Sequence, residues 1–245
     1  MNSATDGSHG LERVQERQDA EREFHDRQYG GTGEGRPAHY RVHPTYPVFL
    51  KMLDFMGDRL PGGAVLEYGC GAGWVTAELA ARGGRVSAFD ISPEAVARTA
   101  SFLEKNRLLD ACSLRVMGGE RLEYPDGAFD LAVGFAVLHH LELPVALPEL
   151  HRVLKPGGLG VFAEPLGSNP LINVYRRLTP RYRSPDEQPI DLSGFARQVT
   201  QFKGFSHHPQ LITAAAASAL AYVPGLARAA KPTQRLLQRL DDLLL

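Results

Sequence analysis

The chain has 245 residues, which corresponds to one or two domains at about 150 residues per domain. Its 27 Lys and Arg residues balance 28 Asp and Glu residues, so the net charge of −1 gives no general attraction to nucleic acid or anionic lipid. No run of about 18 apolar residues and no apolar secretory signal is present. Two cysteines, Cys70 and Cys112, are too few for a disulfide framework or a zinc site. We therefore predict a cytoplasmic protein that acts on neither membranes nor nucleic acid.

The N-terminal segment, residues 1–37, is polar and ends in several glycines. Residues 11–28 are dense in Glu, Arg and Gln and have few apolar positions. This composition suits either a solvent-exposed tail or a helix that closes over a site as a lid, and both alternatives stay open. The aromatic residues of such a lid would be Phe24, His25 and Tyr29.

The remaining residues, 38–245, are expected to form one domain in which short strands alternate with helices. Strands are predicted over 64–68, 86–89, 112–117, 130–135 and 159–163, and helices over 47–56, 74–81, 93–106 and 145–153. Such alternation indicates βαβ units, and hence an α/β fold with a Rossmann-like, doubly wound, mostly parallel sheet. A sixth strand is expected within 205–214 and helices within 215–245, whereas a seventh strand is not recognisable.

A glycine-rich turn follows the first predicted strand, with glycines at positions 69, 71 and 73. The dinucleotide fingerprint requires a glycine where this chain has Trp74, and the Lys of a P-loop is absent. Glu67, just before the turn, would repel a pyrophosphate but suits an ammonium group. Asp90 follows Gly69 by 21 residues, close to the ~20 expected for an acid that binds ribose hydroxyls. A ligand with a ribose and an ammonium group but no pyrophosphate fits S-adenosylmethionine.

The motifs occur in an order that resembles the class I S-adenosylmethionine-dependent methyltransferases, of the small-molecule, type 11-like kind. They are Glu67-Tyr68-Gly69-Cys70-Gly71-Ala72-Gly73, Asp90-Ile91-Ser92, Tyr124-Pro125-Asp126-Gly127-Ala128-Phe129-Asp130, Val137-Leu138-His139-His140-Leu141 and Leu154-Lys155-Pro156-Gly157-Gly158. The resemblance covers about residues 46–164, the expected cofactor core, and leaves 165–245 to determine the substrate.

The resemblance implies a set of residues that contact the cofactor. These are Glu67, Gly69, Cys70, Gly71, Gly73, Asp90, Ile91, Gly119, Glu120, Phe135 and Ala136. Glu67 would orient the ammonium group, Asp90 would bind the ribose, and Ile91 would pack on adenine. The family usually has an Asp near the adenine amino group where this chain has Gly118, so the backbone amides of Gly119 and Glu120 are expected to hold adenine instead.

Three residues are candidates for catalysis. A histidine with a pKa near 6.5 is suited to act as a general base, and His139 and His140 stand where the substrate would enter. Alternatively, one ring caps a helix or bonds to a loop. Glu164, at the end of the fifth strand, would hold a substrate amine, act as a base, or form a structural ion pair.

The segment after Glu164 offers weaker signals. The arginines between residues 175 and 183 suit a carboxylate or phosphate, but acidic residues follow closely and self-pairing is the favoured alternative. His207 and His208 have no partner at ligand spacing, so we predict no metal.

The expected function is methyl transfer from S-adenosylmethionine to an O, N or C atom of a small molecule, with S-adenosylhomocysteine as product and specialised metabolism as the setting. A methyltransferase for RNA or protein is an alternative, disfavoured by the balanced charge. A non-catalytic cofactor- or partner-binding scaffold is another, disfavoured by the intact glycine turn and Asp90.

Overall fold

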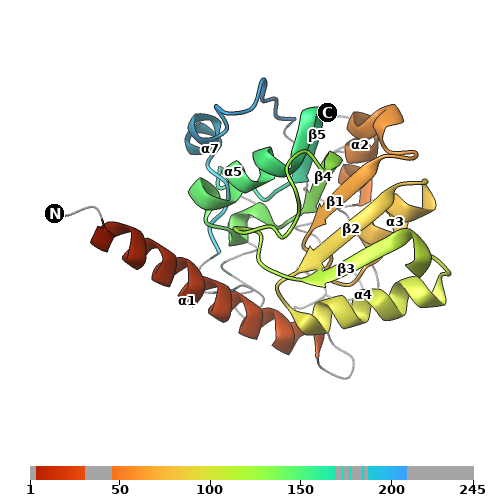
Figure 1. Cartoon of the computed structure of the whole chain (residues 1–245), viewed down its shortest axis with the longest axis horizontal. Coiled ribbons are helices and arrows are strands. Elements are labelled where there is room, and N and C mark those ends of the chain that lie inside the picture. Colours follow the sequence, from red (N-terminus) through yellow and green to blue (C-terminus); the bar gives the residue numbers. More distant parts are fainter. Residues whose placement is uncertain are drawn as a thin grey trace.

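The computed structural model describes residues 4–30, 46–168, 173, 177, 184 and 187–208. The sheet has five parallel strands in the order β3-β2-β1-β4-β5 (Figure 1). The strands are β1 (Ala64–Tyr68), β2 (Arg85–Asp90), β3 (Cys112–Val116), β4 (Phe129–Phe135) and β5 (Leu154–Ala163). The strand order reverses between β1 and β4, and ligands of open α/β sheets bind at the carboxyl ends of the strands beside such a reversal.

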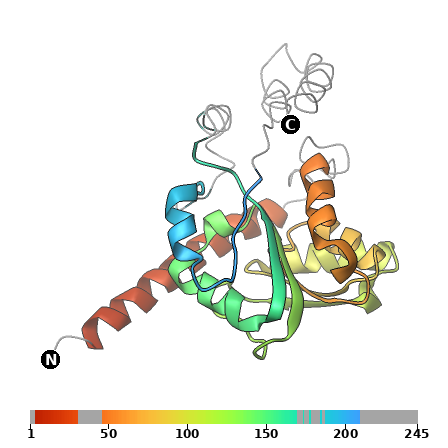
Figure 2. The same cartoon turned by 90° about the horizontal axis from the view of Figure 1, so that it is seen from above.

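Helices connect most successive strands, as βαβ units require, and further helices precede β1 and follow β5. They are α1 (Ala4–Tyr29), α2 (Tyr46–Met56), α3 (Trp74–Ala81), α4 (Pro93–Lys105), α5 (Leu143–Val153) and α7 (Leu192–Gln198), with 3-10 turns η2 (Gly57–Arg59), η3 (Leu109–Ala111) and η4 (Leu138–His140). Ser92 caps α4 as expected, because its Oγ accepts a hydrogen bond from the Ala95 backbone N–H at 3.1 Å. In the N-terminal segment, α1 is one continuous helix that runs along one side of the domain (Figures 1 and 2), and its role as a lid stays a prediction.

Two details differ from the sequence prediction. Strand β5 begins at Leu154 instead of 159, because Leu154 pairs with Phe129 and the register then shifts between Phe129 and Leu131. The predicted sixth strand is wrong for residues 205–208, which are exposed and lie outside the sheet. The rest of that strand and the helices predicted within 215–245 lie outside the described residues.

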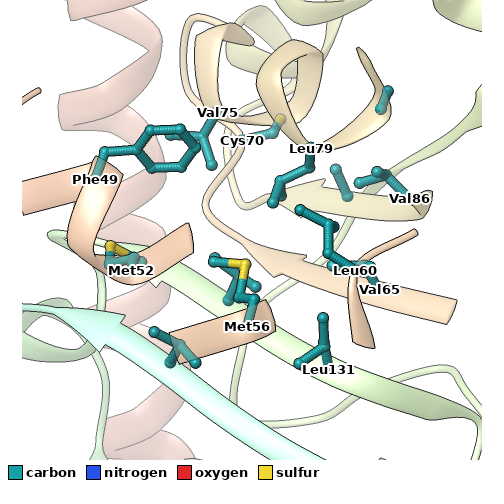
Figure 3. Close-up of a cluster of buried hydrophobic side chains, with 14 residues drawn as sticks. Phe49, Met52, Met56, Leu60, Val65, Cys70, Val75, Leu79, Val86 and Leu131 are labelled. Carbon is teal, nitrogen blue, oxygen red and sulfur yellow. The ribbon is translucent and has the colours of Figure 1, made fainter. Parts of the chain in front are cut away.

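Apolar side chains cover both faces of the sheet. Alternate side chains of a strand point to opposite faces, so Val65 of β1 joins the cluster under α2 and α3, which is shown in Figure 3, and Leu66 joins the cluster toward α5. The first cluster includes Phe49, Met52, Met56, Leu60, Val75, Leu79, Val86 and Leu131. Strand β1, at the centre of the sheet, is therefore packed on both faces up to the glycine turn at its carboxyl end.

We expect Leu66→Ala to lower the free energy of unfolding by about 3 kcal/mol, because Leu66 is fully buried in the central strand and its loss leaves a cavity. Urea unfolding followed by circular dichroism measures the change. Leu50→Ala, at a side chain that is 43% exposed, is the control and should stay within about 0.5 kcal/mol of the parent.

Within the part of the chain that the structure describes, none of the helices combines the length and the apolar character needed to cross a lipid bilayer.

Candidate active site

The glycine turn lies at the carboxyl end of β1. Gly69, Gly71 and Gly73 all have positive φ, and Gly73 is the N-cap of α3. At Gly73 a β-carbon would come within 3.0 Å of the Thr99 backbone, so only glycine fits between α3 and α4. At Gly71 a β-carbon would meet the Tyr29 hydroxyl of α1 at 2.8 Å. The N-terminal helix thus lies directly over the turn.

Asp90, the last residue of β2, joins this turn to the second strand. Its Oδ2 accepts a hydrogen bond from the Gly71 N–H at 2.9 Å, and its Oδ1 accepts one from the Ser92 N–H at 3.0 Å. The side chain is buried, and burial raises the pKa of Asp90. Because each carboxylate oxygen accepts more than one hydrogen bond, both keep a lone pair for a ligand hydroxyl.

Glu67 lies on the same side of the sheet as Val65 and is only 1% exposed. Its Oε2 makes no hydrogen bond to any described residue. Burial raises the pKa of Glu67 to about 8. The negative charge of Asp90 also raises this pKa, whereas the Thr76 hydroxyl lowers it. A buried carboxyl with an unsatisfied oxygen is a site that a cationic group would stabilise.

The turn after β3 is shaped by α1. A β-carbon on Gly118 would collide with the side-chain amide of Gln18, so the glycine makes room for this helix. Gln18 Nε2 donates to Glu120 Oε2 at 2.7 Å, and Glu120 Oε1 accepts from the Glu142 N–H at 3.2 Å. The Glu120 carboxylate therefore fastens α1, while a role in holding adenine is predicted only for its backbone.

The carboxyl end of β4 also faces this region. The Phe135 ring packs edge-on against Trp74 of α3 at 5.4 Å between centroids. Ala136 has a φ of +57°, which is a strained conformation for alanine. A hydrogen bond from its backbone N–H to the Ala163 carbonyl, at 2.7 Å, helps to hold this conformation. Ile91 carries a second link to α1, because its carbonyl accepts from Arg22 Nε at 3.3 Å.

Glu164 holds the turn that carries the two histidines. Its Oε1 accepts from the backbone N–H groups of Val137 and Leu138 at 3.0 and 2.8 Å, and its Oε2 lies 2.7 Å from His139 Nδ1. Both oxygens are thus engaged, which favours the structural alternative for Glu164. His139 is buried, and its Nε2 lies 3.9 Å from Glu187 Oε1.

His140 faces α1 instead. Its Nδ1 lies 3.1 Å from Glu21 Oε2 and 3.3 Å from Ser184 Oγ, and the ring meets His25 edge-on. Burial lowers the pKa of His140. Burial alone would raise the pKa of Glu21, but the His140 and His25 imidazoles hold it well below its usual range. The prediction of a catalytic base at His139 or His140 stays a prediction.

The sequence analysis missed three site residues, Gln18, Glu21 and Ser184. Two of them lie on α1, where positions 18, 22, 25 and 29 recur at helical spacing and turn toward the strand ends. That spacing was the available signal. His207 and His208 are exposed, and the arginine segment between 175 and 183 lies outside the described residues except for Arg177.

Comparisons with known proteins agree with this arrangement. The family described as "Methyltransferase domain" matches residues 66–162. Malonyl-[acyl-carrier protein] O-methyltransferase of Serratia marcescens is 34% identical over 110 residues, which are 44% of this chain and 40% of that protein. Ubiquinone biosynthesis O-methyltransferase of Xanthomonas campestris is 38% identical over 124 residues, 48% of each chain. The matched segments therefore span about half or less of these relatives.

Solved structures show the same fold at lower identity. Geranyl diphosphate C-methyltransferase of Streptomyces coelicolor has a TM-score of 0.59 and 18% identity, over 78% of this chain and 75% of that one. Phosphoethanolamine N-methyltransferase 2 of Haemonchus contortus has a TM-score of 0.61 and 20% identity, over 74% and 43% of the two chains. Residues 66–162 thus match the methyltransferase-domain family, and the five-stranded parallel sheet with its glycine turn has the fold of the class I S-adenosylmethionine-dependent methyltransferases.

Proposed function

We propose that this protein transfers the methyl group of S-adenosylmethionine to an O, N or C atom of a small organic molecule. The observation that carries the proposal is the pairing of Glu67 and Asp90 around the glycine turn. Glu67 offers an unsatisfied, buried carboxyl to the ammonium group, and Asp90 offers two oxygens to the ribose hydroxyls. A nucleotide with a pyrophosphate in place of the ammonium group would meet repulsion at Glu67.

Little further chemistry is required of the protein. The bound cofactor supplies a methyl group already activated by its sulfonium. The residues of this chain hold the cofactor, align the acceptor and exclude water. In this proposal the strand-end turns and α1 line the site, and His139 and His140, in the turn that Glu164 holds, are the candidate bases for a hydroxyl or amine acceptor.

The choice of a small molecule over a macromolecule depends on the balanced charge of the chain. The relatives differ in this respect, since their names specify an acyl carrier protein, ubiquinone biosynthesis and, for a Burkholderia mallei protein 36% identical over 118 residues, ribosomal protein L11. A role in specialised metabolism and a cytoplasmic location remain predictions from the sequence.

Titration calorimetry tests the cofactor, with S-adenosylmethionine and S-adenosylhomocysteine as ligands and NAD as the control. We expect both sulfur compounds to bind at one site and NAD not to bind. Absence of binding at millimolar S-adenosylmethionine contradicts the proposal. Transfer of labelled methyl groups to a panel of small hydroxyl, amine and carbon acceptors, with ribosomal and protein fractions beside it, then tests the acceptor class.

Cofactor binding is expected to release a proton. With a pKa of about 8, Glu67 is mostly protonated at pH 7, whereas pairing with the ammonium group requires the carboxylate. The affinity should therefore rise by nearly tenfold per pH unit well below pH 8, and it should fall again where the ammonium group of the cofactor loses its own proton. Calorimetry in buffers of different ionisation enthalpy counts the released proton. Glu67→Gln, which has no proton to lose, should abolish both the release and the rise in affinity below pH 8.

A further inference from the structure

Three metal-ligating side chains meet between α1 and the turn after β4. Glu21 and His25 lie four residues apart, on one face of α1, and His140 comes from η4. Glu21 Oε2 lies 3.1 Å from His140 Nδ1 and 3.4 Å from His25 Nε2, and the three ligand atoms lie within 4.8 Å of one another. None of these contacts is used to hold the cofactor in the arrangement proposed above, and an ion on His140 would leave His139 as the candidate base.

The spacing of these atoms suits a metal ion. Bonds of about 2.1 Å in a tetrahedron place neighbouring ligand atoms about 3.4 Å apart. The two measured separations from Glu21 Oε2, 3.1 and 3.4 Å, lie close to that value. The third separation, between the two imidazole nitrogens, lies within 4.8 Å, so an ion placed between the three atoms is within reach of all of them after side-chain adjustment.

A second observation points to a missing partner at the same place. Glu21 is 4% exposed, and its Oε2, directed at the two imidazoles, makes no hydrogen bond of good geometry to any described residue. The other oxygen, Oε1, accepts a hydrogen bond from Ser184 Oγ at 2.5 Å. Metal-binding carboxylates are commonly held in this way, through the oxygen that does not face the ion. Leaving a buried carboxylate oxygen unsatisfied costs free energy that a cation would recover.

We propose that Glu21, His25 and His140 bind a divalent transition-metal ion of the zinc type. Two imidazoles and one carboxylate suit such an ion better than Mg²⁺ or Ca²⁺, which prefer oxygen ligands. Three protein ligands leave one position of a tetrahedral ion open for water or for an oxygen of another ligand. The sequence prediction of no metal missed this site because 115 residues separate His25 from His140. The ion would fasten α1 to the body of the domain.

Metal binding by the full-length, untagged chain tests the proposal. After chelator treatment, the protein is titrated with Zn²⁺ and separately with Co²⁺, in the absence of cofactor. We expect one ion per chain, and Glu21→Gln, His25→Ala and His140→Ala should each weaken binding by at least about tenfold, since even the outer partners of metal ligands contribute that much. His207→Ala, at an exposed histidine outside the cluster, should bind like the parent. Failure to retain an ion, or binding unchanged in all three variants, overturns the proposal.

X-ray absorption on the zinc-loaded parent protein keeps the test independent of whether the variants fold. We expect two imidazole ligands, and a shell without imidazole overturns the proposal. Calorimetry with S-adenosylmethionine on the same chelated sample separates this inference from the proposed function. A chain that binds the cofactor but no metal contradicts the metal site alone, whereas one that binds metal but no cofactor contradicts methyl transfer alone.

Discussion

Asp90→Ala is expected to weaken S-adenosylmethionine binding by at least about a hundredfold. Two hydrogen bonds from ribose hydroxyls to a carboxylate contribute about 1.5–3 kcal/mol each, and both are lost together. The variant also frees the Gly71 N–H that Asp90 holds at 2.9 Å, so the glycine turn loses its link to β2. Titration calorimetry measures the affinity, and thermal unfolding verifies that the variant folds.

Asp126→Ala is the matched control for this experiment, because the Asp126 side chain is 81% exposed and pairs with Arg152 at the surface. Its affinity for the cofactor should equal that of the parent. An unchanged affinity in Asp90→Ala would rule out the ribose role of Asp90. The amide variant Asp90→Asn keeps the shape but loses the charge, and should fall between the two.

Removal of residues 1–37 is expected to lower cofactor affinity by about tenfold or more and to reduce turnover further. Helix α1 covers the turns after β1, β2 and β3 through Tyr29, Arg22 and Gln18, so its loss opens the site to water. The rest of the domain should stay folded, because no described residue of α1 belongs to either apolar cluster of the sheet. Calorimetry and methyl-transfer rates measure the two effects.

Gln18→Ala refines that experiment. The Gln18 amide occupies the space beside Gly118, the position at which the sequence resemblance leads us to expect an Asp near the adenine amino group. If Gln18 supplies the missing polar contact, the variant loses affinity for S-adenosylmethionine while Gln15→Ala, at an exposed position on the same helix, does not.

For the truncation of residues 1–37, equal affinities of the truncated chain and the parent, with equal turnover, would show that α1 is not a lid.

Local chemistry explains which parts of the fold were predictable. The strand before the glycine turn and the N-cap at Ser92 each depend on neighbouring residues, and those predictions are confirmed. The start of β5 was not predictable from Leu154, because its strand pairing depends on Phe129, which is 25 residues away. Residues 205–208 carry one large apolar side chain, Phe205, and they are exposed and unpaired with the described strands, so the strand predicted from Phe205 onward does not begin there.

In the candidate site, too, local features were predictable from the sequence and contacts between distant residues were not. Glu67 and Asp90 were recognisable because their positions relative to the glycines are fixed by the βαβ unit itself. Glu21 and His140 are 119 residues apart, and only the docking of α1 brings them together. For Glu164 the sequence allowed a holder of a substrate amine, a base or an ion pair, and the structural alternative is favoured only by backbone N–H groups of Val137 and Leu138 that no residue type encodes.

The polar inner face of α1 has a consequence for the lid predicted from the sequence, which would have to detach from the domain to open the site. The helix is fastened by Arg13 and Arg17 to Glu142, by Gln18 to Glu120 and by Asp26 to Ser92, at 2.5–3.4 Å. All of these groups are readily hydrated, so a detached helix would add little apolar surface to the solvent. If α1 is the predicted lid, repeated opening for cofactor exchange would therefore not expose an apolar, aggregation-prone surface.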